Sequence, residues 1–440
     1  MAAEAKRFPW LLNRMAADPL RGSLPELNDS ARWLDSPLIR QAGPEVLSLA
    51  LMNARNHTLA LLACFEQAMA QGWSGVPQPH LPPALWLIGR IGWFQERWIL
   101  RNLHRAQGPA CDPLGPRMAA QRADADAIWE ADRPVHLELC EGLKIQDLRG
   151  DLLQTLEGTL ELLSGTPQTD EALYFFRLAL HHEDLQCERL VQLMQAQGLP
   201  VERGLREHWS APAVALREPL WLPAGQAILG SSGPGFAFDN EQPAYRLAVP
   251  AFEIDAQPVT WAQYVEFVDD GGYDRQDLWS APGWGWLQDL AAGEGRRGPR
   301  HVEQIGVASG AVLQTRFGQP TRMAGLQPVM HVSWWEADAW CRWAGRRLPL
   351  EIEWEIAATS ASGRGFRWGD VWEWTANRLA PYEGFVSGPD AQYSLGGFGR
   401  TRVLRGGSRV SAARLKSPRL RHFAAPERDD LFCGFRSCAI

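Results

Sequence analysis

The chain has 440 residues, of which 45% are hydrophobic and 22% charged, a composition typical of a globular protein with two or three domains. Its 44 basic and 51 acidic side chains give a formal charge of −7, which does not favour a nucleic-acid-binding protein. No run of about 18 apolar residues predicts a membrane-spanning helix, and the N-terminus lacks the apolar segment of a secretory signal. The seven scattered cysteines contain no Cys-x-x-Cys pair, so we expect neither a zinc knuckle nor a disulfide framework, and we expect a cytoplasmic location.

The first 200 residues are predicted to be helical. Apolar residues recur at helical spacing, and prolines and glycines stand where helices would begin and end. The expected helices span residues 43–72, 82–103, 147–164 and 169–198. Four long helices, with an interruption at 107–134, predict a four-helix bundle, which a linker at 201–225 follows.

Residues 178–190 are predicted to form an amphipathic helix with part of a metal-binding pattern. His182, Gln186 and Arg189 are spaced i, i+4 and i+7, which places them on one face. A His-x-x-x-His-x-Glu helix would direct two imidazoles at one metal, with the Glu as a supporting partner. Here Gln186 stands at the second histidine position, while Glu188 is present.

The pattern changes after residue 225. Gly, Pro and Trp become frequent and short apolar stretches alternate with turn residues, which predicts an α+β domain. Two helices are expected, at 260–269 after the N-cap Thr260 and at 333–344, where Ser333 and Glu336 form a capping box. The Gly- and Arg-rich segment 291–323 is predicted to be a loop or lid.

The chain contains 21 tryptophans, concentrated around residues 86–98 and 279–374. They favour a large aromatic core, with an aromatic box for a quaternary ammonium ligand as the alternative. Both interpretations remain open from the sequence.

The C-terminal half carries an ordered series of short motifs. They are Leu222-Pro223-Ala224-Gly225, Phe238–Pro243, Pro258-Val259-Thr260, Gly271-Gly272-Tyr273, Pro328–Ala337, Arg347–Glu355, Gly369–Thr375, Val403–Ser408 and Gly434-Phe435-Arg436. This series resembles the formylglycine-generating-enzyme-type fold, a C-type-lectin-like α+β domain, over about 215 residues.

Within that superfamily, four segments resemble the ergothioneine-synthase branch: Phe236–Glu241, Asp270–Tyr273, Trp86–Phe94 and His182–Glu188. Members of that branch are non-haem iron enzymes with a DinB-like helical domain, and they use O2 to join a thiol to the imidazole of trimethylhistidine. The compact build is also similar to the selenoneine synthases, which use a selenosugar instead. The resemblance implies an α plus α+β protein with a DinB-like four-helix bundle at 1–200, a linker at 201–225 and a formylglycine-generating-enzyme-type domain at 226–440.

The resemblance implies an Fe(II) site held by three histidines, but only His182 is kept. Arg90 and Gln186 occupy the other two ligand positions. An arginine has no free acceptor and cannot act as a ligand, and a glutamine offers only a weak carbonyl oxygen. His182 is therefore either a remaining ligand or a polar helix residue, and His57 or His181 could enter a rearranged site.

The resemblance also implies substrate-binding residues. In the family, basic residues of the bundle bind the carboxylates of the sulfur substrate, and Arg97 and Arg101 share a helix face at i, i+4; a solvated face is the alternative. Arg421, His422 and Phe423 resemble an element at the pocket edge.

Trp372, Trp374 and Tyr382 correspond to a loop that approaches the iron and the trimethylammonium group in the family. They are candidates for the pocket wall or for the core. A family tyrosine near this place serves as proton donor, and either Tyr382 or Leu379 aligns with it.

Arg90 could also form an ion pair with Glu183 or Glu188, so that a charge pair replaces the metal. Two hypotheses follow. The first is an iron- and O2-dependent enzyme that forms a carbon–sulfur or carbon–selenium bond on trimethylhistidine. The second is a metal-free relative that kept the fold as a binding or accessory protein, as the replaced ligands suggest.

Overall fold

The computed structural model describes residues 33–130, 140, 142–306 and 311–440. Four long helices pack together in its N-terminal part, as the apolar periodicity predicts. The helical elements are α3 (Pro44–Ala70), α4 (Ala84–Gln95) with its π-helical extension η2 (Glu96–Leu100), α5 (Ala125–Trp129), α7 (Ile145–Ser164) and α8 (Asp170–Ala196).

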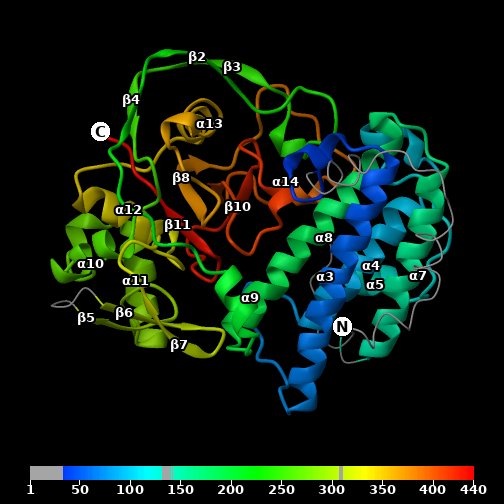
Figure 1. The fold of residues 1–440 in the computed structure, drawn as a ribbon, viewed down its shortest axis with the longest axis horizontal. Helices are drawn as coiled ribbons and strands as arrows, with labels where there is room; N and C mark the ends of the chain where they lie inside the picture. Colours follow the sequence, from blue (N-terminus) through cyan, green and yellow to red (C-terminus); the bar gives the residue numbers. More distant parts are fainter. Residues whose placement is uncertain (1–32, 131–139, 141, 307–310) are drawn as a thin grey trace, which may run out of the picture.

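Capping residues close in sequence determine where α8 begins and ends. The Thr169 hydroxyl accepts a hydrogen bond from the Ala172 N–H at 3.3 Å, and Asp170 and Glu171 lie in the first turn, where acidic side chains stabilise the helix dipole. Gly198, with φ at 63°, follows the last turn. Nearly every residue of α8 is buried, on all faces, because the helix lies between the other bundle helices and the C-terminal domain (Figure 1).

A four-stranded sheet forms the centre of the C-terminal domain. Its order is β10-β9-β8-β11, in which β8 and β11 are parallel and the other neighbours antiparallel. Smaller antiparallel sheets pair β1 with β4 and β2 with β3. The strands are β1 (Leu220–Leu222), β2 (Gly225–Leu229), β3 (Tyr245–Val249), β4 (Phe252–Ile254), β8 (Trp372–Arg378), β9 (Arg402–Arg405), β10 (His422–Ala424) and β11 (Cys433–Phe435).

The helices α10 (Trp261–Asp269) and α12 (Trp334–Trp343) confirm the predicted N-caps Thr260 and Ser333, and Ser333 forms the predicted capping box with Glu336. The domain also contains α11 (Ala281–Glu294), α13 (Glu351–Ser360) and the short α14 (Gln392–Leu395), which the sequence patterns do not predict. The predicted linker contains a short helix, α9 (Arg203–His208).

The prediction of a loop or lid at 291–323 is wrong. This segment completes α11 and then forms an antiparallel three-stranded sheet of β5 (Val302–Gly306), β6 (Ala311–Arg316) and β7 (Gln319–Met323). The inward face of β6 carries Gln314 and Arg316, so polar residues stand where an alternating pattern needs apolar ones.

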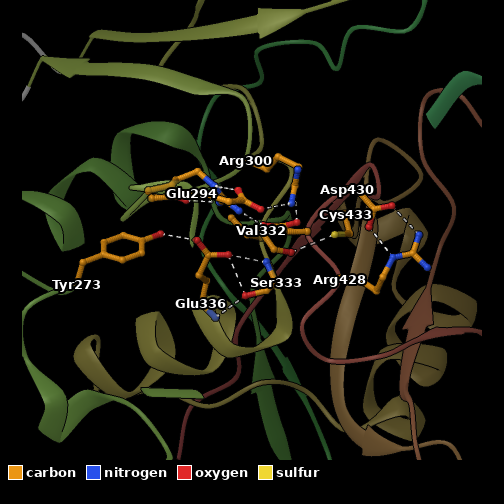
Figure 2. A network of polar contacts seen from close by, with 12 residues as sticks. Tyr273, Glu294, Arg300, Val332, Ser333, Glu336, Arg428, Asp430 and Cys433 are labelled. Atoms are coloured by element: carbon orange, nitrogen blue, oxygen red, sulfur yellow. Dashed lines mark hydrogen bonds and ion pairs between the residues drawn. The ribbon is translucent and has the colours of Figure 1, made fainter. Parts of the chain in front are cut away.

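A polar network joins the helices to the loops beside the central sheet (Figure 2). The Glu336 carboxylate accepts hydrogen bonds from the backbone N–H of Ser333 at 2.7 Å and from the Tyr273 hydroxyl at 2.6 Å. Elsewhere in the same view, Arg428 and Asp430 face each other as an ion pair. In the part of the chain that the structure describes, no disulfide joins the cysteines at positions 64, 111, 187, 341, 433 and 438. Within the described residues, no helix has the length and apolarity to span a membrane.

Candidate functional site

A cavity of about 420 Å³ lies between the bundle and the C-terminal domain. Another cavity, of about 590 Å³, is lined by residues 73–85 and is mainly apolar. The first cavity, which has more polar groups in its wall, is therefore the better candidate for a functional site. We call the first the interdomain cavity. Its wall contains Trp86, Arg90, His182, Gln186, Glu188 and Arg189 from the bundle, and Asp390, Tyr393, His422, Phe423 and Arg428 from the C-terminal domain.

The interdomain cavity brings together seven of the residues singled out from the sequence. They are Arg90, His182, Gln186, Glu188, Arg189, His422 and Phe423. The helical spacing explains the pair His182 and Gln186 on α8, and the antiparallel packing of α4 against α8 brings Arg90 beside them.

His182 is held as a neutral ring. It stacks on Phe94 with ring centroids 3.7 Å apart, and the Gln186 side-chain amide N–H donates to His182 Nε2 at 3.1 Å. Burial, with the added charges of Arg90 and Arg189, lowers the pKa of His182 well below its usual value. The Nε2 lone pair that would bind a metal is therefore occupied by the Gln186 amide.

Arg90 is fixed where the family resemblance places a ligand. Its guanidinium donates to the Trp129 carbonyl and lies over the rings of Trp93 and Trp86, at 4.9 and 5.6 Å from their centroids. Burial lowers the pKa of Arg90 to about 10, so the group stays cationic at neutral pH.

The residues present do not fit a three-histidine iron site. Two of the three positions hold a cation and an amide, and the third is hydrogen-bonded to that amide. Across the described residues, no three His, Cys, Asp or Glu side chains cluster so that they could hold a metal ion.

The two histidines considered for a rearranged site lie elsewhere. His181 is on another face of α8, with its ring 5.2 Å from that of Phe236 and its Nδ1 3.9 Å from Asp184. His57 is exposed on α3. Neither contributes to the wall of the interdomain cavity.

The expected ion pair of Arg90 with Glu183 or Glu188 does not form. Glu183 pairs with Arg55 at 2.9 Å, and Glu188 accepts hydrogen bonds from Trp372 Nε1 at 2.6 Å and the Ser411 hydroxyl at 2.7 Å. The acid that faces Arg90 is Asp390, from the loop before α14.

Among the wall residues, Asp390, Tyr393 and Arg428 were not singled out from the sequence, whereas His422 was. Burial raises the pKa of Asp390 to about 6 and lowers that of His422 to about 3. The Tyr393 ring lies 5.5 Å from that of Phe423. Asp390 and Tyr393 carry no local signal, because the loop around 389–397 has no periodic pattern.

Three other predicted residues lie outside the cavity wall. Trp374 is fully buried and donates from Nε1 to the Val332 carbonyl. Arg421 forms a bidentate pair with Glu351, at 2.9 and 3.1 Å, and lies over the Tyr382 ring at 3.9 Å. Tyr382 is thus placed in a separate core cluster with Tyr245 rather than beside His182.

Trp372 also packs behind the cavity rather than lining it, against the His422 ring at 4.8 Å. Arg97 lines a smaller adjoining cavity of about 190 Å³ and pairs with Glu130 at 3.0 Å. Arg101 forms a bidentate pair with Asp126, at 2.7 Å for both contacts, so an internal carboxylate already occupies it.

Comparison with known proteins covers both halves of the chain. Residues 207–370 and 367–439 match the sulfatase-modifying factor enzyme 1-like domain. A hercynine oxygenase from Mycolicibacterium smegmatis is 30% identical over 445 residues, which covers 89% of this chain and 98% of that protein. A hercynine oxygenase from Mycolicibacterium thermoresistibile is 31% identical over 441 residues, covering 89% and 94%.

The inactive C-alpha-formylglycine-generating enzyme 2 of Mus musculus is 35% identical over 167 residues, 36% of this chain and 51% of that protein. The similarity to the hercynine oxygenases covers 89% of the chain and so extends into the bundle, whereas this shorter match covers 36%. The chain therefore belongs to the ergothioneine-synthase-like family of oxidoreductases, with a formylglycine-generating-enzyme-type domain in its C-terminal half.

Proposed function

We propose that the interdomain cavity binds a small betaine of the trimethylhistidine (hercynine) class, and that it does so without the three-histidine iron site of the family. The observation that carries the proposal is the combination of aromatic and polar groups around one cavity of suitable volume. A cavity of about 420 Å³ lies within the range of small-molecule sites.

The wall offers partners for both the trimethylammonium group and the imidazole of such a ligand. Trp86, Tyr393 and Phe423 supply aromatic rings, which attract a quaternary ammonium group, and Asp390 supplies a carboxyl group. Gln186 Oε1 and the Tyr393 hydroxyl lack hydrogen-bond partners among the described residues. Buried polar atoms without partners are rare in folded proteins, and the polar groups of an imidazole ligand could pair with them.

A second candidate is the O2-dependent formation of a carbon–sulfur or carbon–selenium bond on the imidazole of trimethylhistidine, with a thiol or a selenosugar as the other substrate. The similarity to hercynine oxygenases over 89% of the chain favours it. It needs Fe(II), and Arg90 and Gln186 oppose a family-type iron site. In this view the bundle at 1–200 is DinB-like, 201–225 is a linker and 226–440 is the second domain.

Iron stoichiometry and ligand affinity distinguish the two candidates. The protein is incubated anaerobically with Fe(II), desalted and analysed for iron by mass spectrometry, with and without trimethylhistidine, and ligand binding is followed by calorimetry. We expect trimethylhistidine to bind the metal-free protein and no stoichiometric iron to be retained. About one iron per chain would favour the oxidative synthase, and absence of trimethylhistidine binding would overturn the first proposal.

A further inference from the structure

Arg189 is the wall residue whose role neither the fold nor the family resemblance explains. It lies one helical turn beyond Gln186 on the face of α8 that lines the interdomain cavity, and its side chain is exposed to that cavity. No hydrogen bond or ion pair joins it to any other residue that the structure describes. An arginine among protein groups normally has a carboxylate or carbonyl partner, so an unpaired guanidinium facing a cavity indicates a place for an anion.

The other two guanidinium groups of the wall are already engaged. Arg428 forms a bidentate pair with Asp430, at 2.5 and 2.7 Å. Arg90 donates to the Trp129 carbonyl, lies over two indole rings and faces Asp390. Arg189 is therefore the cation of this wall that remains available to a ligand.

Arg189 lines the cavity together with residues from both halves of the chain. Burial of the two imidazoles is the main cause of the lowered pKa of His182, on the bundle side, and of His422, on the domain side. The positive charge of Arg189 lowers both pKa values further. A ligand group bound to Arg189 would thus lie in a cavity whose walls come from both parts of the chain.

We propose that Arg189 binds the carboxylate of the small molecule held in the interdomain cavity and so selects zwitterionic or monoanionic ligands. This inference rests on the proposed function, which it deepens by assigning the residue that recognises the acid group. The geometry of a guanidinium fits a carboxylate through two parallel N–H···O bonds. Glu188 and Asp390 also line the wall, and their acidic groups disfavour a dianion such as a phosphate monoester.

The test compares ligands and variants in calorimetric titrations of the full chain at pH 7.5. The ligands are trimethylhistidine, its methyl ester and imidazolepropionate, which keeps the ring and the carboxylate but lacks the ammonium group. The variants are Arg189→Gln, Arg189→Lys and the control Arg203→Gln, whose arginine is 84% exposed on α9. Circular dichroism confirms that each variant is folded.

We expect Arg189→Gln to weaken trimethylhistidine binding about 10- to 100-fold, the usual effect of losing one charge-assisted contact. Arg189→Lys should recover most of the affinity, and Arg203→Gln should bind as the parent protein does. The methyl ester should bind the parent protein weakly and should be insensitive to Arg189→Gln, because the partner of the guanidinium is already lost.

The ratio of the affinities for the methyl ester and for trimethylhistidine could be the same in the parent protein and in Arg189→Gln. That result would overturn the role of Arg189 but not the binding of the betaine. The parent protein could instead bind imidazolepropionate, dependent on Arg189, and fail to bind trimethylhistidine. This result would support the carboxylate site at Arg189 and overturn the proposal that the cavity binds a betaine. Binding of neither ligand overturns both.

Discussion

At the residue scale, two side chains in the wall of the interdomain cavity oppose the binding of a metal ion. Gln186 occupies the lone pair of His182, and Arg90 brings a fixed positive charge to the place where a dication would have to lie. Like charges at a few ångströms repel strongly in a buried site, so the arginine opposes a metal even where a histidine remains.

The double substitution Arg90→His with Gln186→His should restore iron binding. It supplies three imidazoles on the two helices that already face each other, and it removes the opposing cation. We expect about one Fe(II) per chain after anaerobic reconstitution, measured by mass spectrometry, against a background level for the unsubstituted chain. Each single variant serves as a control and should retain far less. A double variant that stays iron-free would show that the helices do not present a metal site.

His422 should make stability depend on pH. Burial holds its folded pKa at about 3, below the value of about 6.5 expected when unfolded, so the unfolded chain takes up the proton first. The contribution of His422 is fully present above pH 6.5 and declines as the pH falls towards 3. Between pH 6.5 and 5.0 the loss should be about 1.6 kcal/mol, which His422→Asn should abolish.

Urea unfolding at pH 6.5 and 5.0 measures this difference in the free energy of unfolding. His208→Asn is the matched control, because His208 is exposed on α9. Equal losses of stability in His422→Asn and the parent protein would contradict the burial of the imidazole.

At the element scale, α8 connects the two halves of the molecule. Asp184 pairs with Arg414, Glu188 accepts from Trp372 and the Ser411 hydroxyl, and the Gln195 amide N–H donates to the Thr315 carbonyl at 2.9 Å. The helix thus carries the cavity residues on one face and domain contacts on its others, which explains why so many of its polar residues are buried.

Asp184→Asn should destabilise this junction. The ion pair with Arg414 has contacts of 2.7 and 2.8 Å between side chains that are each only 4% exposed, so its loss leaves a buried guanidinium without its counter-charge. We expect the free energy of unfolding to fall by about 3 kcal/mol in urea titrations. Glu207→Gln, which breaks a pair exposed by 84% and 62%, should change it by less than about 1 kcal/mol. Similar effects of the two variants would mean that the junction does not depend on this pair.

Some elements of the fold and some residues of the site could be predicted from the sequence, and others could not. The bundle helices and the capped helices α10 and α12 were predictable, because periodicity and caps are local signals. The β5–β7 sheet was not, since strand pairing is non-local and β6 places Gln314 and Arg316 inward. Of the site, Arg90, His182 and Gln186 followed from helix spacing and the family motif. Asp390 and Tyr393 did not, because only tertiary packing brings their loop to α8.

At the scale of the whole molecule, the cavity exists only because both halves contribute a wall. His182, Gln186 and Arg189 come from α8, whereas Tyr393 and Phe423 come from α14 and β10. A ligand that contacts both walls stabilises their docked arrangement, and binding to the folded state alone adds about 2.7 kcal/mol at 100 times the dissociation constant.

Trimethylhistidine should therefore slow amide hydrogen exchange in two distant stretches of sequence at once. We expect increased protection in residues 182–192 of the bundle and in residues 390–397 and 422–424 of the C-terminal domain, because opening either wall would release the ligand. Mass spectrometry of the full chain with and without ligand measures this, and residues 73–85, which line the larger apolar cavity, serve as an internal control. Protection confined to one half, or centred on 73–85, would place the ligand outside the interdomain cavity.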